Sequence, residues 1–206
     1  MMNPYNISKL KLISLVTGAT VILLFSLDQP SWADLIFCQP PTPGECLGTP
    51  RDDIIFGWEH VIHGFAGNDY IQTSGSNPNY MFGGDGNDRL LGSGGNDGLY
   101  GGAGNDYYDG GSGSDTIFEE LLEAGSLAFN NEVISGGEGD DYIYSVLGFD
   151  RIHGGPGNDV IYSDGSYRDF SFDTVNCGSG TGDQISYNSG DGDTTANCEQ
   201  INDFDR

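Results

Sequence analysis

The residues of this chain best suited to chemistry are aspartates that recur every nine positions among glycines. Between Gly83 and Phe118 the sequence reads, in blocks of nine, GGDGNDRLL, GSGGNDGLY, GGAGNDYYD and GGSGSDTIF. Each block fits the pattern G-G-x-G-x-D-x-U-x, in which U is a large apolar residue, and only Ser93 departs from its glycine positions. An aspartate carboxylate beside glycine carbonyls offers oxygen ligands alone, and this set suits hard cations, calcium above all.

The same blocks predict the elements that must position these aspartates. Glycines allow the positive φ angles and close backbone approach of a tight turn, and the last three residues of each block alternate like a short strand. A fixed period of this length is the signature of a solenoid. The alternative is a disordered tract rich in glycine and aspartate, but disorder does not require the apolar residues found at position eight of each block: Leu90, Leu99, Tyr108 and Ile117.

These blocks resemble the RTX (hemolysin-type) calcium-binding nonapeptide repeats. The resemblance implies an all-β fold, a right-handed parallel β-roll in which two nonapeptides make one coil. Each ion is then expected between one turn and the turn two repeats further along the chain. Residues 83–88 would share an ion with residues 101–106, and residues 92–97 with residues 110–115.

Weaker repeats flank the intact ones. On the N-terminal side, residues 64–72 are nearly whole with Phe65 in place of a glycine, so residues 64–69 are expected to face residues 83–88. Residues 48–56 are degenerate, and residues 73–82 are one residue too long and have lost the glycine positions of the pattern. We expect residues 73–82 to hold the phase of the spiral and to bind nothing.

An interruption, EELLEAGS at residues 119–126, follows Phe118 and predicts either a short helical turn or a bulged loop. The repeats then resume, with complete copies at residues 136–144 and 154–162 and a weak copy between them. Residues 136–141 are therefore expected to face residues 154–159.

The resemblance implies several calcium ions, held by positions one, three, five and six of the intact or nearly intact turns. These positions are Gly64, Ala66, Asn68, Asp69, Gly83, Asp85, Asn87, Asp88, Gly92, Gly94, Asn96, Asp97, Gly101, Ala103, Asn105, Asp106, Gly110, Ser112, Ser114, Asp115, Gly136, Glu138, Asp140, Asp141, Gly154, Pro156, Asn158 and Asp159.

The composition limits the partners. The chain has 31 acidic and 7 basic residues, a net charge of -24, so neither nucleic acid nor an anionic membrane surface is an expected partner. Self-repulsion and glycine entropy predict a metal-free chain that is marginal or unfolded, so that calcium binding drives folding. The expected affinity is about 0.1 to 1 mM, as in extracellular calcium modules.

The first 33 residues are predicted to be a signal peptide. Lys9 and Lys11 form a basic region, residues 12–27 form an apolar stretch, and Ser31-Trp32-Ala33 suits cleavage after Ala33. The alternative is a membrane anchor, for which the stretch is short, since spanning needs about 20 residues. The expected location is therefore secreted or extracellular, with the periplasm possible.

Export favours disulfides among the four cysteines, for which three connectivities exist. We expect local pairing, Cys38 with Cys46 and Cys177 with Cys198, so that each bridge clamps one end of the roll. A zinc site is the alternative, but no C-x-x-C spacing occurs. The resulting domains are an N-terminal cap at residues 34–47, the roll at residues 48–162, and degenerate repeats with a C-terminal cap at residues 163–206.

Catalytic motifs are not found. His60 and His63 lie in HVIH rather than HExxH, and no G-x-S-x-G occurs. The sequence therefore predicts a non-enzymatic, structural or surface-associated module; the alternative is a remnant or accessory module of a secreted RTX enzyme or toxin. An extracellular polymer or cell surface is a conceivable partner of a tyrosine-rich face, although ordinary strand packing explains the same residues: Tyr70, Tyr100, Tyr107, Tyr142, Tyr144 and Tyr162.

Overall fold

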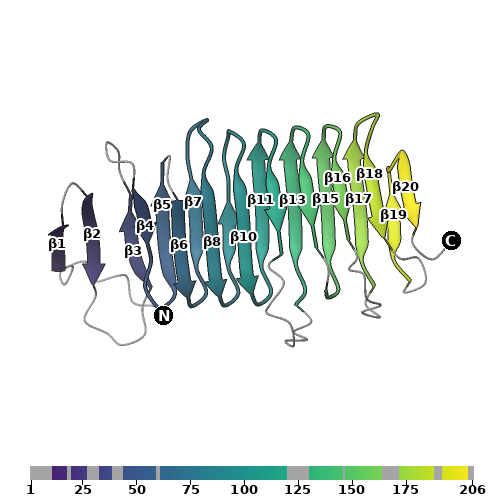
Figure 1. The fold of residues 1–206 in the computed structure, drawn as a ribbon. Coiled ribbons are helices and arrows are strands. Elements are labelled where there is room, and N and C mark those ends of the chain that lie inside the picture. Colours follow the sequence, from purple (N-terminus) through teal and green to yellow (C-terminus); the bar gives the residue numbers. More distant parts are fainter. Residues whose placement is uncertain are drawn as a thin grey trace, which may run out of the picture.

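The structure is a stack of coils of β-strand along one axis (Figure 1). This computed structural model describes residues 11–17, 20–26, 33–38, 44–58, 61–119, 130–145, 147–163, 172–187 and 192–203, with side chains from residue 33 to residue 202 of these ranges. Every element among them is a strand, and a helix long and apolar enough to cross a membrane does not occur in this part of the chain. The expected all-β solenoid is thereby confirmed.

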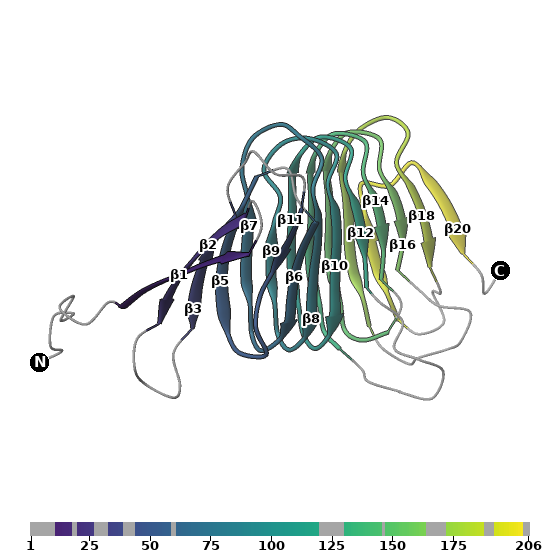
Figure 2. The ribbon, with the colours of Figure 1, turned by 60° about the vertical axis from the view of Figure 1, so that its left-hand side comes forward.

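Two sheets form the body of the roll and lie face to face as two layers (Figure 2). From β3 onward each coil places one strand in each sheet, and neighbouring coils pair in parallel. The first sheet contains β1 (Lys11–Thr17), β2 (Thr20–Ser26), β3 (Asp34–Phe37), β5 (Asp53–Gly57), β7 (Tyr70–Thr73), β9 (Arg89–Leu91), β11 (Tyr107–Ser112), β13 (Val133–Glu138), β15 (Arg151–Pro156), β17 (Thr174–Ser179) and β19 (Thr194–Ala196). The second contains β4 (Glu45–Leu47), β6 (Val61–Ala66), β8 (Tyr80–Asp85), β10 (Gly98–Ala103), β12 (Thr116–Phe118), β14 (Tyr142–Tyr144), β16 (Val160–Tyr162), β18 (Gln184–Tyr187) and β20 (Gln200–Asp203).

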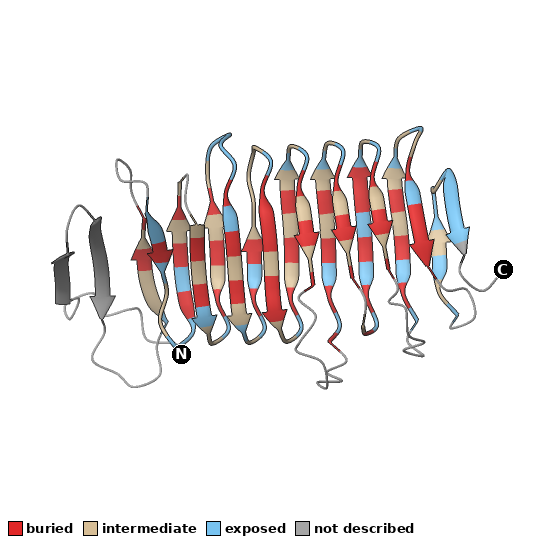
Figure 3. Ribbon diagram, viewed as in Figure 1, coloured by how far each residue is buried: buried red, intermediate tan, exposed pale blue. Residues whose placement is uncertain are grey.

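The core is a double row of apolar side chains at position eight of the repeat, one from each strand between β3 and β18. Parallel pairing aligns Leu90 with Tyr108 in the first sheet and Leu99 with Ile117 in the second, and all four are fully buried. Buried and more exposed residues alternate along the strands, as Figure 3 shows. Because side chains of a strand point alternately to opposite faces, a single apolar position per repeat is enough to give each strand an inward anchor.

The outer face of the second sheet carries a row of stacked rings. The ring centroids of His63 and Phe82 are 4.8 Å apart, as are those of Phe82 and Tyr100, and the row continues through Phe118 to Tyr144 and Tyr162. Tyr142 also contacts this row. The six tyrosines that the sequence suggested as one face therefore lie on two different sheets, because Tyr70 and Tyr107 belong to strands of the first sheet.

Two disulfides join the expected cysteines. Cys38 bonds Cys46 at the N-terminal end of the roll, and Cys177 bonds Cys198 at the C-terminal end. Residues 163–206, predicted as degenerate repeats with a C-terminal cap, contain strands β17 and β18, which continue the two sheets of the roll.

Two predictions concern segments that the structure describes only in part. The interruption at residues 119–126 lies outside the described residues except for Glu119. Of the predicted signal segment, β1 and β2 form an antiparallel pair, and Phe25 of β2 lies opposite Leu35 at the start of the roll.

Glycine is required where one turn lies on the next. Gly86 has φ +141°, and a Cβ there would overlap the carbonyl oxygen of Gly67 in the preceding coil. Gly75 also has a positive φ, +104°, but a Cβ there would meet nothing within 4 Å.

We predict that Gly86→Ala destabilises the calcium-loaded roll clearly more than the matched Gly75→Ala, whose cost should be about 1 to 2 kcal/mol of backbone strain. Denaturant unfolding at saturating calcium measures both free energies, and equal losses would contradict close turn stacking.

Candidate metal sites between the turns

The turns form two rows, one along each edge of the roll. On the first edge, the chain passes from the second sheet to the first, and residues 64–69, 83–88 and 101–106 stack in consecutive coils. On the second edge it returns, and residues 92–97, 110–115, 136–141 and 154–159 stack in the same way. All the pairs of turns expected to face one another are therefore neighbours in space.

One neighbour pair was missed from the sequence. The backbone N–H of Asp115 donates to Asp141 Oδ1 at 2.8 Å, although 26 residues separate them. Residues 110–115 and 136–141 are thus adjacent on the second edge, because the extra residues after Phe118 are accommodated on the first edge. Counting in nines could not show this, since the interruption breaks the period.

An aspartate ladder runs along each edge at position six. The backbone N–H of one aspartate donates to Oδ1 of the equivalent residue in the next coil, as from Asp69 to Asp88 and from Asp88 to Asp106, both at 2.7 Å. The same bond at 2.8 to 2.9 Å links further pairs on the two edges: Asp53 with Asp69, Asp97 with Asp115, Asp115 with Asp141, Asp141 with Asp159, and Asp159 with Asp183.

The second oxygen of most of these carboxylates is buried without a hydrogen-bond donor from the described residues. This is true of Oδ2 in Asp69, Asp88, Asp115, Asp141, Asp159 and Asp183. A buried carboxylate oxygen without a partner is costly unless its charge is neutralised. The row of such oxygens is the observation that indicates a cation between the turns.

Backbone oxygens point into the same spaces. At Gly83, a Cβ would strike both Asp88 Oδ2 of its own turn and the carbonyl oxygen of Gly101 in the next coil. At Gly136, it would strike Asp141 Oδ2 and the carbonyl oxygen of Gly154. Equivalent pairs of oxygens meet at the other position-one glycines, namely Gly48, Gly64, Gly92, Gly110 and Gly154.

Position-two and position-four carbonyls, which sequence reasoning did not include, also face the next turn. A Cβ on Gly104 would overlap the Gly86 carbonyl, and a Cβ on Gly102 would strike the Gly84 carbonyl. The groups around each space are therefore carboxylate and carbonyl oxygens, a set that fits Ca²⁺.

Residues at positions three and five already have partners in the structure. The position-three carbonyls of Asp85, Ala103, Glu138 and Pro156 accept backbone N–H groups from the preceding turn at 2.7 to 2.8 Å. At position five, an outer ladder joins the turns: Asn68 Oδ1 accepts the N–H of Asn87 at 2.9 Å, and Asn87 Oδ1 accepts that of Asn105 at 2.8 Å. On the second edge the side-chain oxygens of Asn96 and Asp140 accept the N–H groups of Ser114 and Asn158.

The ladders vary where a turn is irregular. Asp97 Oδ2 accepts a weak bond from the Ser93 N–H at 3.4 Å, and Asp106 Oδ2 lies 3.5 Å from the Tyr108 hydroxyl. At Gly101 the Tyr108 hydroxyl takes the place that a carbonyl of the next coil has elsewhere. The regular first-edge site therefore ends at residues 101–106.

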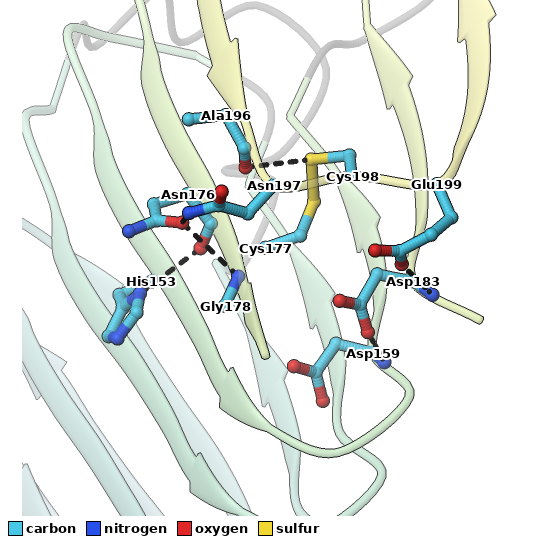
Figure 4. Close-up of a disulfide and its surroundings, with 10 residues drawn as sticks. All are labelled: His153, Asp159, Asn176, Cys177, Gly178, Asp183, Ala196, Asn197, Cys198 and Glu199. Carbon is cyan, nitrogen blue, oxygen red and sulfur yellow. Dashed lines mark hydrogen bonds between the residues drawn. A yellow bond between two sulfur atoms is a disulfide. The ribbon is translucent and has the colours of Figure 1, made fainter. Parts of the chain in front are cut away.

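At the C-terminal end the second-edge ladder continues to Glu199 (Figure 4). Asp159 donates its N–H to Asp183 Oδ1, and Asp183 donates to Glu199 Oε2, each at 2.9 Å. The Cys177–Cys198 disulfide lies beside these carboxylates and joins β17 to the segment before β20. Asp183 was absent from the predicted ligands; its signal was an aspartate two residues before the core residue Ile185.

Burial raises the pKa of the ladder aspartates above its ordinary value, and neighbouring carboxylates add to the effect in most of them. The pKa is about 7 for Asp69, Asp106 and Asp141, and about 6 for Asp88, Asp115 and Asp159. The pKa of Asp53, Asp97 and Asp183 is raised for the same first cause, desolvation. Without a cation, protons are the available counter-charge.

The comparison with protein families agrees with this geometry. The model of the RTX calcium-binding nonapeptide repeat matches in four copies, at residues 61–77, 82–117, 130–145 and 135–166. A search of curated proteins finds no match. The matched residues include both edges of the roll and the weak repeats around residues 130–153.

A pH dependence follows for the calcium-free chain. Because the folded pKa values of about 6 to 7 lie above the ordinary 3.8, protonation favours folding; this stability is present at low pH and is lost as pH rises through 6 to 7. We predict more β-structure by circular dichroism in chelator at about pH 5 than at about pH 8, with calcium restoring it at the higher pH. A calcium-free signal that is unchanged or grows with pH would contradict the raised values.

Proposed function

Because this chain is an RTX-repeat protein, whose nonapeptides belong to a calcium-binding repeat family, we propose that it binds several Ca²⁺ ions between consecutive turns and completes its folding in doing so. The single observation that carries the proposal is the row of buried aspartate oxygens without donors. A bound cation neutralises these carboxylates and connects turn to turn.

The proposed ligands of each ion are the position-six Oδ2 of one turn, the position-one carbonyl of the next, and position-two and position-four carbonyls. Position three accepts hydrogen bonds through its backbone carbonyl and position five through its side-chain oxygen, and these bonds hold successive turns in register. First-edge ions would lie between the turns from residue 48 to residue 106, and second-edge ions between those from residue 92 to residue 183. The ordering cost of the glycine-rich turns is offset by these metal contacts.

We propose further that the protein is exported and works as a non-enzymatic structural or surface-associated module. Two disulfides support export, since such bonds persist in oxidising compartments and are rare in the cytosol. The low calcium of the cytosol would leave the chain unfolded until it has left the cell. The structural role is supported by the extent of the roll, whose strands run from Asp34 in β3 to Asp203 in β20.

The calcium proposal is tested by removing one ligand charge. Asp88→Asn should weaken the sites on both sides of residues 83–88, at least about tenfold, since even the loss of a second-shell partner costs 10- to 100-fold in metal affinity. Calcium titrations followed by circular dichroism and calorimetry measure the change, with magnesium as a comparison ion. Asp109→Asn, on β11 outside the turns, is the charge-matched control. Equal calcium response of both variants and the parent would refute the inter-turn sites.

The export proposal has its own test. Expression of the full chain in a bacterium with a general secretion pathway should give a shortened protein outside the cytoplasm whose first residue is Asp34. Edman sequencing and intact mass measure the cleavage point, and replacement of Ala33 by a bulky residue should block it. A full-length protein retained in the membrane fraction would support the anchor instead.

A further inference from the structure

A compact group of three acidic side chains lies on the first edge, at the point where the regular turns stop. Glu119, Glu132 and Asp150 are 3%, 1% and 2% exposed, and one carboxylate oxygen from each lies within 4.8 Å of the others. They come from three segments: the end of β12, the start of β13 and the start of β15. Residues 120–129, between the first two, and residue 146, between the last two, lie outside the described residues.

The backbone explains why these side chains meet. Glu132 occupies the ladder position of an aspartate, because its N–H donates to Asp150 Oδ1 at 2.9 Å and Val133 donates to the carbonyl of Asp106 at 3.0 Å. Glu119 is fixed from the other sheet, where its N–H donates to the carbonyl of Tyr144 at 3.0 Å. Three positions that the sheets hold in register thus direct their carboxylates to one place.

Glu132 is the least satisfied member of the group. Both of its carboxylate oxygens are buried and receive no hydrogen bond from the described residues. Asp150 differs, since Ser145 donates to its Oδ2 at 2.6 Å, and Glu119 Oε2 accepts the N–H of Leu147 at 3.3 Å. Within the described part of the chain, this buried glutamate has no donor to compensate its two oxygens, which face two further carboxylates, and this is the condition that a cation would relieve.

The surroundings are anionic as well. Burial, then the nearby side chain of Asp150 and the charges of Asp150, Glu119 and Asp106, raise the pKa of Glu132 to about 11. The buried Tyr108 hydroxyl lies in the same field, since the charges of Asp106, Glu132 and Glu119 raise its pKa after burial does. Without a cation, Glu132 therefore stays protonated at neutral pH.

We propose that Glu119, Glu132 and Asp150 form a calcium site of a second kind, built from carboxylate side chains instead of glycine carbonyls. Calcium suits it better than magnesium, because oxygens that all lie within 4.8 Å of one another can reach one ion at about 2.3 to 2.6 Å, and calcium accepts irregular oxygen coordination whereas magnesium needs near-octahedral geometry at about 2.0 to 2.1 Å. The ion would hold the coils together on the first edge, where the interruption removes a regular turn.

Crystals of the full chain grown in calcium and then in terbium test this site directly. An anomalous peak among the three carboxylates is expected, in addition to peaks between the glycine turns. Peaks at the turns with none here would overturn this inference alone, and the reverse would overturn only the inter-turn sites. The two proposals therefore fail separately.

Matched variants give the solution test. Glu132→Gln should bind one calcium fewer than the parent by equilibrium dialysis, and Glu119→Gln should do the same. Glu45→Gln, an equivalent change at an exposed residue of β4, should bind the full number. If Glu132 only shares a proton with Asp150, the glutamine variants will bind as many ions as the parent, and the site is refuted. If Glu132→Gln does not fold, Glu119→Gln and the anomalous map still decide.

Discussion

The structure depends on the neutralisation of carboxylates that parallel strand pairing stacks one above another. Neighbouring strands lie about 4.8 Å apart, and two unit charges at that distance repel by about 3 kcal/mol in an effective dielectric of 20. A whole domain has a net stability of about 5 to 15 kcal/mol. Several ladder aspartates charged at once would therefore outweigh the rest of the fold, so the roll needs protons or cations along both edges.

The turns whose aspartates must be neutralised occur along both edges of the roll. Regular turns occupy the first edge from residue 64 to residue 106 and the second edge from residue 92 to residue 159. The two rows overlap in the middle of the chain, so the coils in between are held on at least one edge. Where the first edge loses its glycines, the acidic group at Glu132 takes over the ladder position. A solenoid whose stability is a sum of neighbour contacts gains most from such continuity.

Apolar burial and ring stacking stabilise the roll away from its edges. From β3 to β18 each coil buries one apolar side chain per sheet, and the stacked rings from His63 to Tyr162 connect the second sheet along its outer face. These contacts do not depend on metal. They explain how the register of the coils is defined even though each strand contains only three to six residues through most of the roll.

Local pattern alone predicted the repeat and the buried position-eight row, because a nine-residue period fixes both the strand face and the turn chemistry. The β-roll and the stacking of alternate turns were implied by the resemblance to RTX repeats, and the cysteine pairing was expected from the place of each pair near one end of the repeats. Only the tertiary structure decided which turns meet across the interruption, as Asp115 and Asp141 do, and that Glu119 joins Glu132 and Asp150. The sequence of an insertion does not indicate which edge of the roll accommodates it. The distance between carboxylates in separate coils is set by sheet pairing, which acts between residues far apart in the chain.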